Sequence, residues 1–112
     1  MIRVYYARDE GEHVLTINGH AGYAEYGKDI VCAGVSAIAF ALLSWLEHNE
    51  DEITQFDEVM VEDGQVYITC SGSDKLTTAF QVALMGLIEI ARAHPKYVDI
   101  AYISQQASDS RE

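Results

Sequence analysis

Two residues whose side chains can carry out nucleophilic catalysis stand on either side of a short loop that is bracketed by glycines. His20 follows the segment "NG", and Cys32 lies at the start of a long apolar run, with eleven residues between the two. An imidazole that takes the proton of a thiol turns the thiol into a strong nucleophile. The pair therefore indicates covalent catalysis of acyl transfer. The alternative is that Cys32 is only a small buried residue and His20 only a polar group at the surface.

The predicted start of a helix at residue 30 gives Cys32 a favourable environment for a thiolate. With Asp29 as N-cap, Cys32 is the third helical residue, beside unpaired N–H groups and the positive end of the helix dipole. The dipole contributes only about 0.3–1 kcal/mol, and a free thiol is only a few per cent ionised at neutral pH. A nearby histidine would have to supply the rest of the stabilisation that a thiolate needs at neutral pH. The N–H groups around Cys32 and Ala33 are candidates to hold the oxyanion of an acyl-transfer intermediate.

Other residues of this segment have two interpretations each. Asp29 either orients His20 or serves simply as the N-cap, and the cap is favoured. Ser36 lies one turn beyond Cys32, where it either hydrogen-bonds within the site or bonds back to its own helix. The loop is either a mobile lid over Cys32 or an ordinary surface connection. Four of its residues supply unusual backbone angles or contact surface: Gly22, Tyr23, Tyr26 and Gly27.

Other chemistries fit this segment less well. No metal or other cofactor is expected, because neither His20 nor Cys32 has a second Cys or His at metal-ligand spacing and zinc usually takes four ligands. A tyrosine-phosphatase loop would need an arginine a few residues after Cys32, where the sequence reads "AGVSAI". The second cysteine, Cys70, is expected to be a small buried packing residue and not a reactive thiol, in a strand that ends at the opposite edge of the sheet.

Turn signals and hydrophobic spacing predict the elements that must position these residues. The predicted strands cover 2–7, 13–19, 56–62, 65–71 and 97–103, and the predicted helices cover 30–47 and 74–94. The order is ββα-ββα-β, and alternation of strand direction places His20 and Cys32 at the same edge of the sheet. The expected fold class is α/β of the α+β type: a two-layer domain with a mostly antiparallel sheet packed with two helices. It would span residues 1–104, followed by a polar tail over 105–112.

The totals are those of one ordinary globular domain. The chain has 112 residues, 49% of them apolar and 22% charged. Its net charge of −11 disfavours nucleic acid, which needs basic residues to neutralise phosphates. That charge suits a basic protein partner, or it only keeps the protein soluble. Neither a signal peptide nor a membrane span is expected, and the two cysteines then indicate free thiols in the cytoplasm.

The helix predicted over residues 30–47 is apolar nearly all round, which predicts packing on more than one side. Its most buried positions are expected to be Val31, Val35, Ile38, Leu42, Trp45 and Leu46. Phe40 and Trp45 are expected to fill the core or a subunit interface. A homodimer is therefore expected.

The segment "GHAGYAEYGKDIVCAGVSA" resembles the signature of the ribosomal-processing cysteine proteases called Prp, and the resemblance covers nearly the whole chain. The family pattern is Gly-His-Ala, a flexible loop, then Gly-x-Asp-Ile-Val-Cys-Ala and a serine four residues after the cysteine. The matching positions are Gly19, His20, Ala21, Gly27, Asp29, Ile30, Val31, Cys32, Ala33 and Ser36.

The resemblance implies a specific activity. The nucleophile of the family falls on Cys32 and its catalytic histidine on His20, with no cofactor. Family members remove a short N-terminal extension from the large-subunit ribosomal protein numbered twenty-seven, form homodimers, and have a loop before the cysteine that is thought to move when substrate binds. Two rival hypotheses are a non-catalytic ribosome-associated or assembly protein that binds a basic ribosomal protein, and a thioesterase or other small acyl hydrolase that uses the same dyad.

Overall fold

The computed structural model describes residues 1–25 and 28–105. The elements in chain order are β1 (Ile2–Asp9), β2 (Glu12–Asn18), α1 (Ile30–His48), the 3-10 helix η1 (Glu50–Glu52), β3 (Ile53–Glu62), β4 (Gln65–Gly72), α2 (Asp74–Ala93) and β5 (Val98–Gln105). The predicted order ββα-ββα-β is confirmed. The short helix η1 was not predicted, and β3 begins earlier than expected. The predicted loop residues Tyr26 and Gly27 and residues 106–112 of the predicted tail lie outside the described residues.

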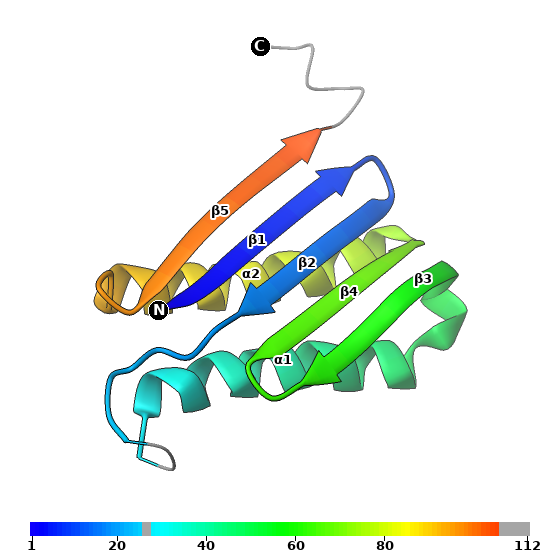
Figure 1. Ribbon diagram of the computed structural model, residues 1–112. Coiled ribbons are helices and arrows are strands. Elements are labelled where there is room, and N and C mark those ends of the chain that lie inside the picture. The colour runs from blue at the N-terminus through cyan, green and yellow to red at the C-terminus, as the bar shows by residue number, and fades with distance from the viewer. Residues whose placement is uncertain (26–27, 106–112) are drawn as a thin grey trace.

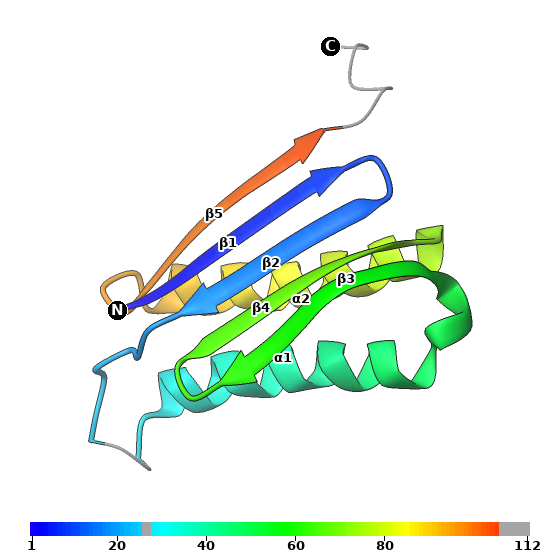
Figure 2. The same ribbon diagram turned by 45° about the vertical axis from the view of Figure 1, so that its right-hand side comes forward.

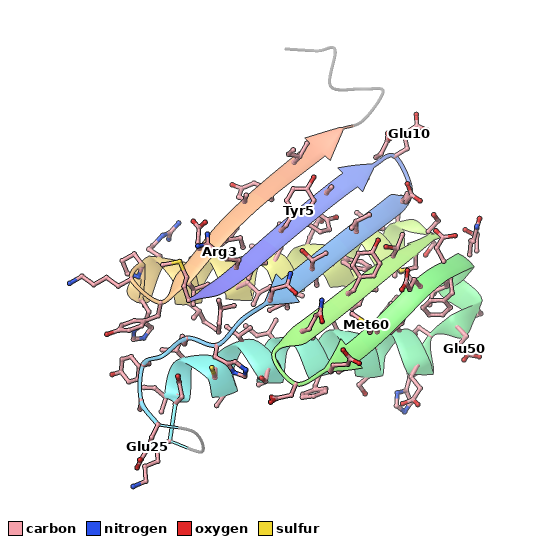
Figure 3. All side chains as sticks on the ribbon, viewed as in Figure 1. Arg3, Tyr5, Glu10, Glu25, Glu50 and Met60 are labelled. Atoms are coloured by element: carbon pink, nitrogen blue, oxygen red, sulfur yellow. The ribbon has the colours of Figure 1, made fainter. Side chains whose placement is uncertain are left out.

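The strands form one sheet in the order β3-β4-β2-β1-β5. All neighbouring pairs are antiparallel except β1 and β5, which run parallel. Both helices pack on the same face of this sheet, α1 on the side of β3 and α2 on the side of β5 (Figures 1 and 2). The side chains of Arg3, Tyr5 and Met60 project outward from the face of the sheet that the helices do not cover (Figure 3). The predicted α+β fold class is confirmed.

The core lies between the sheet and the helices, and alternating strand residues point into it. Leu15 and Ile17 of β2 and Ile68 and Cys70 of β4 are almost completely buried. Cys70 is thus a small packing residue of the core, as the sequence predicted. Burial raises the pKa of the Cys70 thiol to about 11, with a smaller effect of Asp57 in the same direction, so this thiol stays neutral.

His13 is also part of the core, although it stands next to the β1–β2 hairpin. It points inward because it is in phase with Leu15 and Ile17 along β2. Its ring stacks on Phe80 with 4.6 Å between centroids. The Nδ1 atom lies 2.7 Å from the Tyr6 hydroxyl and the Nε2 atom 3.1 Å from the Thr77 hydroxyl. Both ring nitrogens therefore have partners, which is what a buried imidazole requires.

Both helices begin directly after a capping side chain, and Asp29 is the cap predicted for α1. The Asp29 side chain accepts a hydrogen bond from the N–H of Cys32, and the Ser73 side chain accepts from the N–H groups of Lys75 and Leu76. Cys32 is therefore the third residue of α1, as expected. This cap fixes where the thiol emerges relative to the sheet.

Helix α1 packs against α2 at two glycines. A Cβ at Gly34 would lie 3.3 Å from Ile90, and a Cβ at Gly86 would lie 2.8 Å from Ile38. Because Ile38 turns toward α2 in this way, it is only partly buried, and Ala39 joins the fully buried row of α1 instead.

The aromatic residues of α1 have different surroundings. Trp45 is half-buried against the core. Phe40 does not lie in the core, because its side chain is 57% exposed, and a place in a subunit interface stays a prediction. Both α1 and α2 are long and apolar enough to cross a bilayer, a test that core helices of soluble proteins also pass.

Candidate active site

Three segments meet at one end of the sheet: the end of β2, the start of α1 and the β3–β4 turn. Asn18 at the end of β2 pairs with Gln65 at the start of β4. The N–H of Gly19 donates to the carbonyl of Gly64 in the turn at 2.8 Å. Figure 1 shows the loop after β2 leading to the start of α1 beside this turn. The three segments enclose an open cleft of about 770 Å³.

Cys32 is half-buried in this cleft, and its sulfur has a backbone hydrogen-bond donor. The N–H of Ala21 points at Sγ with a distance of 3.2 Å. Ala21 itself is 4% exposed, so its position is fixed by packing. A donated hydrogen bond and a helix start both favour the charged form of a sulfur atom. The location of Cys32 thus suits a thiolate.

Asp29 organises the backbone on both sides of Cys32. One carboxylate oxygen accepts from the N–H of Cys32 at 2.9 Å, and the other accepts from the N–H of Tyr23 at 3.0 Å. Partial desolvation raises the pKa of this carboxyl group, but hydrogen bonds from Cys32, Tyr23 and Ala24 outweigh that effect and hold the pKa below its usual value. Asp29 is therefore a cap and an anchor of the loop. Among the described residues, none of its hydrogen bonds goes to His20.

His20 shares the cleft with Cys32 and lies directly over the β3–β4 turn. A Cβ built on Gly64 would lie 2.7 Å from His20 Nε2. The ring is exposed, and within the described chain it makes no hydrogen bond with Cys32. Catalytic hydrogen bonds are often long or absent in structures without substrate. The shared cleft therefore brings the predicted pair together without forming the bond that proton transfer needs.

The two predicted supporting residues of α1 also line the cleft. Ser36 lies one turn beyond Cys32 and is exposed. Its hydroxyl makes no hydrogen bond to another described residue, so it does not bond back to its helix in this structure. The N–H of Ala33 donates to the Asp29 carbonyl at 3.0 Å. The N–H groups of Cys32 and Ala33 are therefore both occupied, and neither is free for an oxyanion as predicted.

The loop before α1 contributes unequally to the cleft. Gly22 and Ala24 line it. The Tyr23 ring instead packs edge-on against His94 and Tyr97, with centroids 5.5 and 5.2 Å apart. Tyr23 thus ties the loop to the junction between α2 and β5. The role of the loop as a lid stays a prediction.

Sequence reasoning missed the contribution of the second hairpin. Phe40 of α1 and several residues around the β3–β4 turn also line the cleft. The turn residues are Val61, Glu62, Asp63, Gly64, Gln65 and Val66. The alternation of strand directions contained the signal, because a strand that ends with Cys70 at the far edge must start at the edge that carries His20.

Metal chemistry has no ready ligand set in the part of the chain that the structure describes. No group of three or more His, Cys, Asp or Glu side chains there is arranged to hold a metal ion.

Comparison with known proteins places this arrangement in a family. The family model described as "Cysteine protease Prp" matches residues 1–99. The chain belongs to the Prp family of cysteine proteases. The ribosomal processing cysteine protease Prp of Mycoplasma pneumoniae is 36% identical over 86 residues, which cover 77% of this chain and 83% of that protein. The Prp of Mycoplasma genitalium is 33% identical over 89 residues, which cover 80% of this chain and 87% of that protein.

A solved Prp structure has the same fold. The structure of Prp from S. aureus in complex with a covalently linked product peptide aligns with a TM-score of 0.78 and 27% identity. The alignment covers 91% of this chain and 99% of that chain. The protein is therefore a ribosomal-processing cysteine protease of the Prp family. Of the hypotheses that the sequence left open, a protease is favoured over a non-catalytic binding protein.

The role of Asp29 in this Prp-family site leads to a first prediction. Asp29→Asn retains a side-chain acceptor for the Cys32 N–H and is expected to keep peptide cleavage within a few-fold of the parent rate. Asp29→Ala removes the cap and the loop anchor and is expected to lower the free energy of unfolding by about 1 kcal/mol. Urea unfolding and cleavage assays on both variants check this. A large loss of cleavage in the folded Asn variant would restore the role of Asp29 as orienter of His20.

Proposed function

We propose that this protease removes a short N-terminal extension from large-subunit ribosomal protein twenty-seven, with Cys32 as the nucleophile and His20 as the general base. One observation carries the catalytic part: Cys32 accepts a backbone N–H bond at a helix start, in a cleft that it shares with His20. The resemblance of the segment around these residues to the Prp signature supports the substrate. The covalently linked peptide of the S. aureus enzyme is consistent with a nucleophilic mechanism.

The proposed reaction has two halves. His20 takes the proton of Cys32, and the thiolate attacks the scissile carbonyl to form a tetrahedral intermediate. The C–N bond breaks as His20 returns the proton to the leaving amine, which leaves an acyl group on sulfur. A water molecule then gives its proton to His20 and attacks the thioester, and Cys32 is released with a proton from His20. No cofactor is needed to balance either half.

The oxyanion of this intermediate needs donors other than those predicted. The N–H groups of Cys32 and Ala33 are occupied by Asp29. The N–H of Ala21 is 3.2 Å from Sγ. The oxyanion is the oxygen attached to the carbon that becomes bonded to that sulfur. We therefore assign Ala21 N–H first to the thiolate and then to the oxyanion.

The charge of the cleft suits a basic peptide. Asp29, Glu62 and Asp63 line it, and the chain as a whole has a net charge of −11. Ribosomal proteins are commonly basic, so this field would favour encounter with such a substrate. Apolar residues of the cleft, including Phe40 and Val61, would contact side chains of the bound segment.

The proposed assembly is a homodimer in the cytoplasm. Val82 and Met85 of α2 are 63% and 65% exposed, beside a groove between α1 and α2 that includes Trp45. Exposed apolar side chains next to such a groove are typical of an interface. We expect a dimer by sedimentation equilibrium and a shift toward monomer for Met85→Glu. A monomer at all concentrations would refute the proposed dimer.

Mass spectrometry tests the proposed function directly. The ribosomal protein carrying its extension is incubated with the protease and with Cys32→Ala and His20→Ala. We expect a single N-terminal cut that disappears in both variants. An intact substrate that still binds would overturn the proposed substrate, and a cut that survives in either variant would overturn the dyad.

A further inference from the structure

The β3–β4 turn touches His20 through the one turn residue that has no side chain. In the described structure, Gly64 lies against the tip of the imidazole. A Cβ at this position would be 2.7 Å from Nε2, 3.2 Å from Cε1 and 3.4 Å from Cδ2. All three ring atoms belong to the end of the ring that carries Nε2. Gly64 therefore limits how far this end of the His20 ring can move toward the turn.

The backbone on which His20 is mounted is tied to the same turn. The N–H of Gly19 donates to the carbonyl of Gly64 at 2.8 Å. On its other side, Gly19 has a φ of 98°, and a Cβ there would collide with the carbonyl oxygen of Met1. The backbone before His20 is thus held between the turn and the start of β1. The remaining freedom of the ring lies in its side-chain torsions, and Gly64 restricts those.

Gly64 has two separate reasons to be glycine, and they have different consequences. Its φ of 72° lies in the left-handed region, where any L-residue is strained, so a substitution costs stability. The contact with His20 is different, because the ring is the exposed end of a flexible side chain. An added methyl group would push the ring aside without disturbing the core. The fold would survive, but the His20 ring would leave its position beside the turn.

We infer that Gly64 is a positioning residue of this protease: the backbone of the β3–β4 turn, without a side chain at this position, keeps the His20 ring in the cleft that it shares with Cys32. This inference rests on the proposed dyad. It makes the second hairpin, which supplies neither the nucleophile nor the base, part of the catalytic apparatus. Residues on both sides of Gly64 line the cleft, so a bound peptide would contact the same turn that supports the ring.

A double-mutant cycle between Gly64→Ala and His20→Ala tests the inference. Cleavage of the extended ribosomal protein and alkylation of Cys32 by iodoacetamide across pH 5–9 are measured for the parent, both single variants and the double variant. We expect Gly64→Ala to lower kcat/KM about 100-fold, since misplacing a catalytic group has effects of that size. Its alkylation profile against pH should approach that of His20→Ala. In the His20→Ala background, which is expected not to cleave, Gly64→Ala should change the rate of Cys32 alkylation by no more than about two-fold.

Two further variants separate ring displacement from backbone strain. Gly22 has the same φ of 72°, but a Cβ there would meet nothing within 4 Å. Gly22→Ala therefore measures the strain alone: it should lower the melting temperature as Gly64→Ala does, yet leave the NMR titration curve of His20 unchanged. Gly64→Asn places a Cβ against the ring while tolerating positive φ better than alanine does. It should lose cleavage like Gly64→Ala with a smaller loss of stability.

The outcomes distinguish this inference from the proposed function. Full activity in a folded Gly64→Ala variant would overturn the inference and leave the dyad standing. An equal change in the rate of Cys32 alkylation from Gly64→Ala with and without His20 would also overturn it, because the effect would then not pass through the ring. A parent protein that cuts no ribosomal substrate, but whose Cys32 alkylation depends on both His20 and Gly64, would overturn the substrate and support the inference.

Discussion

Replacing Cys32 with serine is expected to lower kcat/KM for peptide cleavage by at least about 10⁴-fold while the protein stays folded. The serine hydroxyl can still accept the hydrogen bond from Ala21 N–H, so the local structure is retained. A hydroxyl group is far less acidic than a thiol, and neither a helix start nor His20 would ionise it at neutral pH. Mass spectrometry of the substrate and a thermal melt of the variant are the measurements.

The second cysteine provides the matched control. Cys70 is completely buried between β4 and the helices. Cys70→Ala is expected to lower the free energy of unfolding by about 1 kcal/mol through lost packing and to leave cleavage unchanged. If Cys32→Ser retained cleavage while Cys70→Ala lost it, the nucleophile would have to be reassigned.

Acidification is expected to destabilise the fold through His13. Burial, assisted by the nearby Arg8 charge, lowers the pKa of His13 from 6.5 to about 4 in the folded state. The unfolded state binds this proton more readily, so the stability that comes from a neutral His13 is fully present above pH 6.5. It is lost as the pH falls from there toward 4. At pH 4 the loss from this residue amounts to about 3 kcal/mol.

A non-titrating variant isolates this effect from the protonation of the many carboxylates. His13→Gln retains an amide that can bond to the Tyr6 and Thr77 hydroxyls but takes up no proton. The difference in free energy of unfolding between the parent and this variant should shrink by about 3 kcal/mol between pH 7 and pH 4. Parallel stability curves in urea titrations, or an NMR titration of His13 near 6.5, would contradict the prediction.

Much of this fold is set by interactions between residues that are close in sequence. Alternation along β2 and β4 fixed which residues face the core, and Asp29 and Ser73 fixed the starts of the helices. Asp63-Gly64 is a dipeptide that favours hairpin turns, and Gly64 has the positive φ that such a turn needs. Sequence also indicated the pairing of a histidine with a cysteine at one edge, because strand direction alternates in successive hairpins.

Other features depend on which distant segments pack together. The parallel pairing of β5 with β1 and the placement of β4 beside β2 join residues far apart in the chain. That placement brings Gly64 against His20 and makes the β3–β4 turn a wall of the cleft. The burial of His13 likewise required α2, since Thr77 and Phe80 complete its surroundings.

The sequence by itself therefore determined the order of the elements, their caps, the cysteine and histidine that are candidates for catalysis, and the family. These depend on periodicity and on motifs whose residues are neighbours along the chain. Only the tertiary structure decided that the N–H of Ala21 faces the Cys32 sulfur, that Asp29 occupies the N–H groups of Cys32 and Ala33, and that Gly64 supports His20. These contacts depend on the spatial order of strands and on loop geometry, which are set by the packing of the whole chain and not by local patterns.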